Sequence, residues 1–72
     1  MSITAEIYLA VGVPWNRGWE VILLDPRGGV LATATARHAE DVEQVGRSLL
    51  RLNLPRGRRP VQMHVKCTPV TS

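Results

Sequence analysis

The residue types that could carry chemistry in this chain begin with His64 and Cys67, which lie three positions apart in its last apolar run. Residues an odd number apart in a strand point to opposite faces, so these two side chains cannot easily share a metal ion. The other histidine, His38, is distant in the sequence, and Ser48 has no evident histidine and acid partners for a nucleophilic triad. The sequence therefore predicts no metal site, no catalytic residue and no cofactor, and it predicts Cys67 as a small core residue.

Acidic residues gather near the middle of the chain, where Glu40, Asp41 and Glu43 fall within four positions. Negative side chains in the first turns of a helix are stabilised by its dipole, so we interpret this cluster as a helix start. Asp25 falls in a turn-forming run, and the glycines lack the strand-to-helix placement of a phosphate-binding loop. Because no inward cluster of carboxylates is evident, we expect no enzyme.

Positive charge is concentrated in the second part of the chain. Residues 46–72 carry six Lys or Arg and no acid, whereas residues 1–45 carry three Arg and six acids. Such a basic segment is typical of surfaces that bind nucleic acid or another polyanion. Solvation, complementation of a helix dipole, or pairing with the acidic half of a second copy are alternative explanations. The candidate nucleic-acid-binding residues are Arg47, Arg51, Arg56, Arg58 and Arg59.

Both tryptophans of the chain, Trp15 and Trp19, flank a short polar loop that contains Arg17. Trp and Arg are over-represented among the residues that dominate binding energy in protein interfaces. We expect Trp19 to pack in the sheet, because a large aromatic ring is usually well buried. Trp15 either closes the end of the core or lies in an interface, and the interface is the interpretation we favour. Trp15 and Arg17 are therefore candidate partner-binding residues.

The 72 residues have room for a single domain, residues 1–72. Alternating apolar residues predict a first strand from about Ile3 to Val13, which Pro14 should end because proline cannot donate to a sheet. Further strands are expected over about 19–24, 30–35 and 61–67, separated by turn-forming residues. The predicted fold class is α+β, a β-β-β-α-β order with a single four-stranded mixed sheet and one helix on one face.

The helix should begin near His38 or Ala39 and pack on the sheet through one apolar stripe. The stripe consists of Ala39, Val42, Val45, Leu49 and Leu52. Gly46 lies on the same stripe, where glycine costs about 1 kcal/mol of helix propensity relative to alanine. A close approach of the helix to the sheet would explain this glycine.

One helix covers only one face of the sheet, so the other face should be covered by another chain. We expect the alternate residues Ile7, Leu9 and Val11 to face the helix. The opposite face would then present Thr4, Glu6, Tyr8 and Ala10 from the first strand, His64 and Lys66 from the last, and either Ile22 and Leu24 or Trp19, Val21 and Leu23 from the second. Tyr8 and Ile22 are therefore candidate partner-binding residues, and we expect a homodimer formed through this face or an edge strand.

Three stretches follow one another in the β-β-β-α-β order. They are Tyr8-Leu9-Ala10-Val11-Gly12-Val13, the hairpin from Val21 to Ala32, and Val65-Lys66-Cys67-Thr68-Pro69. Together they resemble the first half of the ribonuclease H-like superfold, in particular the opening of resolvase-like transposases. Those enzymes hold two divalent metals with carboxylates at the ends of the first and fourth strands, where this chain has Pro14 and Lys66. This departure predicts that the chain is no metal-dependent nuclease.

The same half-fold without catalytic acids is similar to the HicB-type antitoxins. Gly18-Trp19-Glu20-Val21 and the segment 38–43 fall where such domains place a strand-opening aromatic and an acidic helix start. The resemblance implies a non-catalytic protein that self-associates as a dimer and binds a protein partner. The apolar runs are too short to span a bilayer and the N-terminus lacks the plan of a signal peptide, so we expect no membrane contact and a cytoplasmic location.

Overall fold

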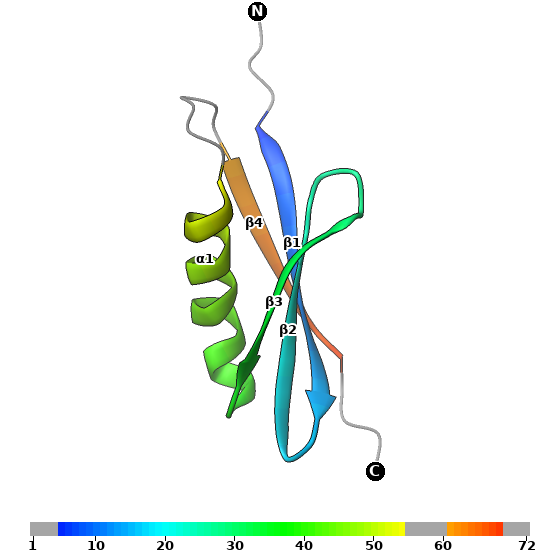
Figure 1. Ribbon diagram of the computed structural model, residues 1–72, viewed down its shortest axis with the longest axis vertical. Coiled ribbons are helices and arrows are strands. Elements are labelled where there is room, and N and C mark those ends of the chain that lie inside the picture. Colours follow the sequence, from blue (N-terminus) through cyan, green and yellow to red (C-terminus); the bar gives the residue numbers. More distant parts are fainter. Residues whose placement is uncertain (1–4, 55–60, 69–72) are drawn as a thin grey trace, which may run out of the picture.

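The computed structural model describes residues 5–54 and 61–68. Its elements are β1 (Glu6–Trp15), β2 (Gly18–Leu24), β3 (Val30–Ala36), a short 3-10 turn (Ala39–Asp41), α1 (Val42–Asn53) and β4 (Val61–Cys67) (Figure 1). The predicted α+β class and β-β-β-α-β order are confirmed. The expectations for Ile3 and Thr4 fall outside the described residues.

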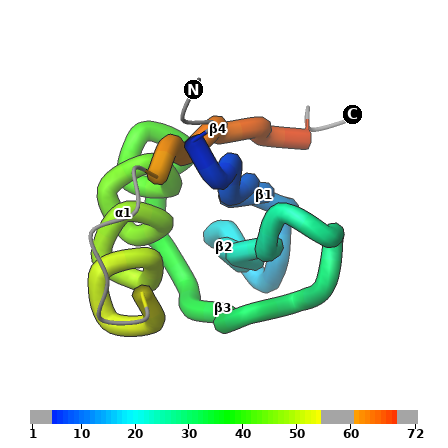
Figure 2. Tube along the Cα trace, turned by 90° about the horizontal axis from the view of Figure 1, so that it is seen from above, coloured from blue at the N-terminus to red at the C-terminus, as the bar shows by residue number. Residues whose placement is uncertain are grey.

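The four strands form one mixed sheet in the order β3-β2-β1-β4. β1 lies antiparallel to β2 and parallel to β4, and β2 lies antiparallel to β3. Figure 2 shows α1 along one side of the twisted sheet, and none of the other described elements covers the opposite side. The prediction of a mixed sheet with one helix on one face is confirmed, and we refer to the uncovered side as the open face.

A two-residue turn joins β1 to β2, and β1 runs through Pro14. Asn16 and Arg17 have φ angles of 44° and 67°, the positive values that a type I′ hairpin turn requires. Trp15 pairs with Gly18 across this turn, so the ring nitrogen of Pro14 faces away from β2, and the last described pair between β1 and β4 is Gly12 with Cys67. The prediction that Pro14 ends the strand is wrong, because among the described strands no hydrogen bond is lost at this proline.

The turn from β2 to β3 is organised by Asp25. Its carboxylate Oδ1 accepts hydrogen bonds from the backbone N–H groups of Arg27 at 2.9 Å and Gly29 at 2.8 Å. Its carbonyl oxygen accepts another from the N–H of Gly28 at 2.9 Å, and Gly28 has a φ of 89°, which favours glycine. A bulge beside Leu24 follows, after which β3 continues in regular register with β2.

The core lies between α1 and the covered face of the sheet. Its buried side chains are Tyr8, Ala10, Val21, Leu23, Val42 and Leu50. From the middle of β1, Ala10 and Gly12 face the helix, and Gly12 lies directly beneath Val42. The prediction that Ile7, Leu9 and Val11 face α1 is therefore wrong, because the helix lies too close to the strand for their larger side chains.

The helix approaches the sheet closely at Gly46, as the position of this glycine on the stripe predicted. A Cβ on Gly46 would lie 2.7 Å from the Cβ of Ala10, whereas carbon atoms pack at about 3.5–4.0 Å. The buried positions of α1 are Val42, Gly46 and Leu50. Ala39 and Leu52 are exposed, so their prediction as core residues is wrong. Leu52 lies about 120° around the helix from Gly46, at 3.6 residues per turn.

Candidate functional site

The open face of the sheet carries a continuous run of apolar side chains. The register pairs Leu9 with Leu24 and Val11 with Ile22, and residues paired directly across antiparallel strands share a face. All four keep part of their surface exposed, and Ile7 is 47% exposed. We refer to this surface as the apolar strip, which consists of Ile7, Leu9, Val11 and Val13 from β1 and Ile22 and Leu24 from β2.

Exposed polar side chains border most of the apolar strip on both sides, whereas the β3 residue paired with Leu24 is Val30, an apolar residue that is 66% exposed. On the β3 side the polar side chains are Thr33 and Thr35, which pair with β2. On the β4 side they are Gln62, His64 and Lys66, which pair with β1. An apolar centre surrounded by a polar, solvent-accessible rim is the arrangement found in protein–protein interfaces.

Ile22 and Tyr8, which were both predicted on the open face, lie on opposite faces of the sheet. Ile22 lies in the apolar strip, beside Val11. Tyr8 lies on the other face beneath α1, where it is 5% exposed, and its hydroxyl donates a hydrogen bond to Glu6 Oε2 at 3.4 Å. The placement of Tyr8 on the open face is wrong. Sequence reasoning missed four residues as part of this surface: Leu9, Val11, Val13 and Ile7.

The β1–β2 turn places both of its predicted partner-binding residues, Trp15 and Arg17, at the surface. Trp15 is 64% exposed and follows Val13 by two positions in β1, so it extends the apolar strip toward the turn. Trp19 is partly buried against the core, as predicted. A depression of about 330 Å³ lies between this turn and the end of β3, with Trp15 and Arg37 in its lining.

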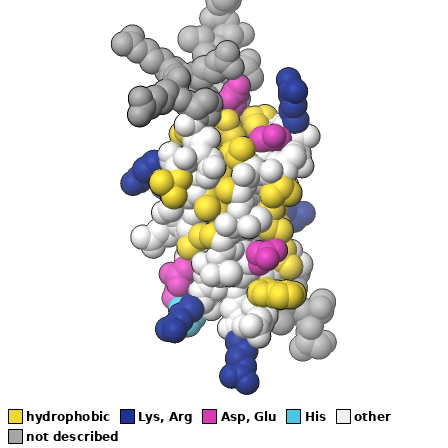
Figure 3. Space-filling model, viewed as in Figure 1, with side chains coloured by type: hydrophobic (Ala, Val, Ile, Leu, Met, Phe, Trp, Pro, Cys, Tyr) yellow, Lys and Arg dark blue, Asp and Glu magenta, His cyan; other side chains and the backbone are white. Residues whose placement is uncertain are grey.

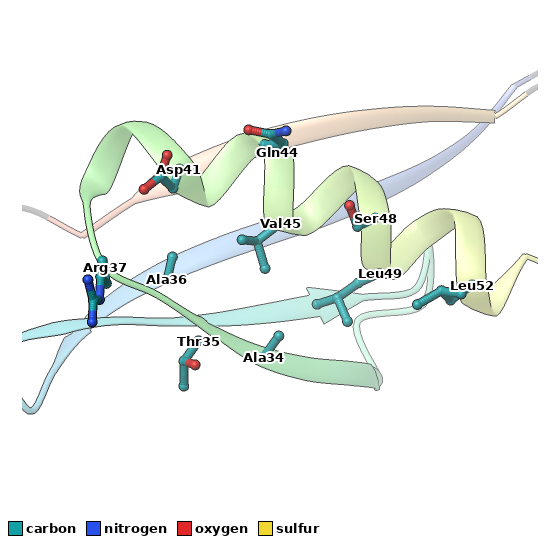
Figure 4. Close-up of a pocket in the computed structure, with 10 residues that line it drawn as sticks. All are labelled: Ala34, Thr35, Ala36, Arg37, Asp41, Gln44, Val45, Ser48, Leu49 and Leu52. Atoms are coloured by element: carbon teal, nitrogen blue, oxygen red, sulfur yellow. The ribbon is translucent and has the colours of Figure 1, made fainter.

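A groove of about 580 Å³ lies between α1 and β3. Ala34 and Ala36 point toward the helix from β3, and Val45 and Leu49 point toward the strand from α1 (Figure 4). Because alanines line the strand side, the helix and the strand leave space between them. Leu52 lines the same groove and is 81% exposed.

Two of the five predicted nucleic-acid-binding residues, Arg47 and Arg51, are among the described residues, and both lie on α1. Arg47 and Arg51 are exposed and four residues apart, so they lie on one side of the helix. Nη2 of Arg47 is 3.2 Å from Oε1 of Glu43, and this exposed ion pair offsets the charge of one of the two arginines. The remaining candidates lie outside the described residues: Arg56, Arg58 and Arg59. Nucleic-acid binding stays a prediction.

The side chains with potential chemistry do not converge in the part of the chain that the structure describes. No three His, Cys, Asp or Glu side chains there are placed to hold one metal ion. Cys67 is exposed, so its prediction as a core residue is wrong. No helix among residues 5–54 and 61–68 has the length and apolar character needed to cross a membrane.

No protein-family model, curated protein or solved structure matches this chain. The resemblance to the ribonuclease H-like superfold and to HicB-type antitoxins therefore stays a prediction. The apolar strip and the groove beside β3 are the surfaces from which a function can be inferred.

Proposed function

We propose that this protein is a non-catalytic interaction protein that self-associates through the open face of its sheet and binds a protein partner, as an antitoxin or an accessory subunit would. The apolar strip is the observation that carries the proposal. Six apolar side chains lie together on a face that α1 does not cover, and their transfer out of water is favourable. Contiguous exposed apolar surface with a polar rim marks an interaction site.

The self-association is tested by replacing the centre of the strip with a charge. Ile22→Lys introduces an ammonium group where the second copy would bury it, and Gln62→Lys introduces the same group at the exposed rim. Light scattering at micromolar concentrations should give a wild-type mass at least twice the 8.0 kDa of one chain. Ile22→Lys should lower that mass and Gln62→Lys should preserve it, with circular dichroism confirming that both variants are folded.

A wild-type mass of 8.0 kDa throughout the micromolar range would overturn the proposed self-association. A folded Ile22→Lys variant with the wild-type mass would show that the open face is not the contact. The partner is tested by comparing the proteins that co-purify from the host with wild-type protein and with Trp15→Ala, because Trp15 is exposed beside the strip. Identical co-purifying proteins would remove the turn as the partner-binding site.

A further inference from the structure

We propose that a second copy of this chain also docks along the outer edge of β3 and into the groove between β3 and α1, so that two sheets join into one continuous eight-stranded sheet. This inference rests on the proposed self-association and adds a second contact to it. The groove lies on the covered side of the sheet, whereas the apolar strip lies on the open face. Different substitutions can therefore remove the two contacts separately.

The two edges of the sheet differ in how they are protected against pairing. β3 has the sequence VLATATA, with no charged residue and no proline. β4, at the other edge, carries the exposed side chains of His64 and Lys66. Natural sheets block unwanted edge pairing with charged side chains, especially lysine, and with proline. The edge at β3 lacks these devices over its full length and is the edge open to another strand.

The groove beside β3 offers apolar surface to whatever pairs with that strand. Figure 3 views the molecule as in Figure 1, and hydrophobic side chains form a band down the middle of this view, with Lys and Arg around its margin. Leu52 is 81% exposed and lines the groove together with the partly buried Val45 and Leu49. A second helix lying beside α1 would cover Leu52, which no described part of the chain covers.

The charges of α1 indicate that the occupant is a second α1 in the opposite direction. Glu40 and Asp41 lie in the 3-10 turn before α1, Glu43 lies in its first turn, and Arg47 and Arg51 follow along α1. Of these residues, Asp41 lines the groove. A two-fold axis perpendicular to the sheet makes the two β3 strands antiparallel and also makes the two helices antiparallel. Each acidic end then lies beside a basic end, and the helix dipoles are opposed in the favourable sense. A parallel arrangement would place like charges together.

The size of the open face gives a further reason to join two sheets. Four strands about 4.8 Å apart, with about seven residues rising about 3.4 Å each, present roughly 450 Å² in projection. Standard interfaces bury about 800 Å² on each partner. Joining two sheets at β3 gives a continuous open face of roughly 900 Å², twice the single value. Two such eight-stranded sheets can stack through their open faces in a tetramer with 222 symmetry, in which each open face is covered by the chain related to it by the two-fold axis across the strands.

The experiment measures the mass in solution and the hydrogen-exchange protection of the β3 backbone N–H groups. Both are measured in wild-type protein and in variants of each contact. Leu52→Glu and Ser48→Glu place a carboxylate in the groove at exposed positions, where folding should tolerate it. Val65→Glu is the matched control, an apolar-to-acidic change at the edge strand β4. Light scattering should give about 32 kDa for wild-type protein, four times 8.0 kDa, and about 16 kDa for Leu52→Glu and for Ser48→Glu. The double variant Leu52→Glu, Ile22→Lys should be a monomer, and Val65→Glu should keep the wild-type mass.

Hydrogen exchange supplies the second readout, because the outward backbone N–H groups of β3 should be protected in wild-type protein and exchange freely in Leu52→Glu. Unchanged mass and unchanged β3 protection in both groove variants would overturn the inference, as would an equal loss of mass in Val65→Glu. A wild-type dimer that Leu52→Glu converts to a monomer while Ile22→Lys has no effect would support the β3 contact and refute the open-face contact. A wild-type dimer that Ile22→Lys converts to a monomer while Leu52→Glu has no effect would refute the β3 contact and support the open-face contact.

Discussion

The close approach of α1 to the sheet makes Gly46→Ala a destabilising substitution. In a solvated helix this change should stabilise by about 1 kcal/mol, because alanine has the higher helix propensity. Here the added Cβ would meet the Cβ of Ala10 at 2.7 Å, about 1 Å closer than two carbon atoms pack. Ala10 is fully buried on a strand that lies between β2 and β4, so it cannot move aside. Overpacking of this kind costs about 1–3 kcal/mol, which leaves a net loss of about 1 kcal/mol.

The assay is urea unfolding followed by circular dichroism at one fixed protein concentration, since association contributes to apparent stability. Ser48→Ala in the same helix is the control, and it should be neutral or slightly stabilising because Ser48 is exposed. In an Ala10→Gly background the obstructing methyl is absent, so Gly46→Ala should stabilise there. The two backgrounds should differ by about 2 kcal/mol of coupling. If Gly46→Ala stabilises wild-type protein as much as it stabilises the Ala10→Gly variant, the close-approach explanation is refuted.

Three further predictions concern the surface. Arg17→Gly should stabilise the fold by roughly 0.5–1 kcal/mol, because a residue with a side chain at a φ of 67° is strained; unfolding with no gain would argue against a strained turn. Trp15→Ala should weaken assembly, measured by dilution in light scattering, more than it lowers the urea midpoint, since 64% of Trp15 is exposed in one chain; equal losses would remove the turn from the interface. If the basic segment binds nucleic acid, affinity for a short labelled duplex should fall steeply with salt and Arg51→Ala should reduce the slope by about 1, whereas salt-insensitive binding would exclude phosphate contacts.

The element order, the single helix and the turn residues could be predicted because each has a local cause. Alternation marks strands, the acids of residues 40–43 mark a helix start, and Asp25 followed by proline and two glycines marks a tight turn. Pro14 gave a wrong strand end because proline is harmful only where a neighbouring strand needs its N–H. That condition depends on how far the partner strands reach, which the sequence of one strand does not contain.

The alternation in β1 predicts the wrong face for the helix. The set with Ile7, Leu9 and Val11 is uniformly apolar, whereas the other set contains Glu6 and Tyr8, so the pattern alone predicts that the first set faces α1. The distance between helix and strand decides the matter: Gly46 can touch the sheet only if a small residue such as Ala10 lies beneath it. The glycine in the helix was thus a usable signal for the face, and it would also have placed Leu52 away from the core.

The central claim, that a second copy covers the open face, is tested most directly by isotope-filtered NMR on a mixture of methyl-labelled and unlabelled wild-type chains. The methyl groups of Val11 and Ile22 should show nuclear Overhauser contacts to protons of the other copy, because both lie in the apolar strip. Contacts of these methyl groups only to their own chain and to water, at a concentration where light scattering shows association, would contradict the claim.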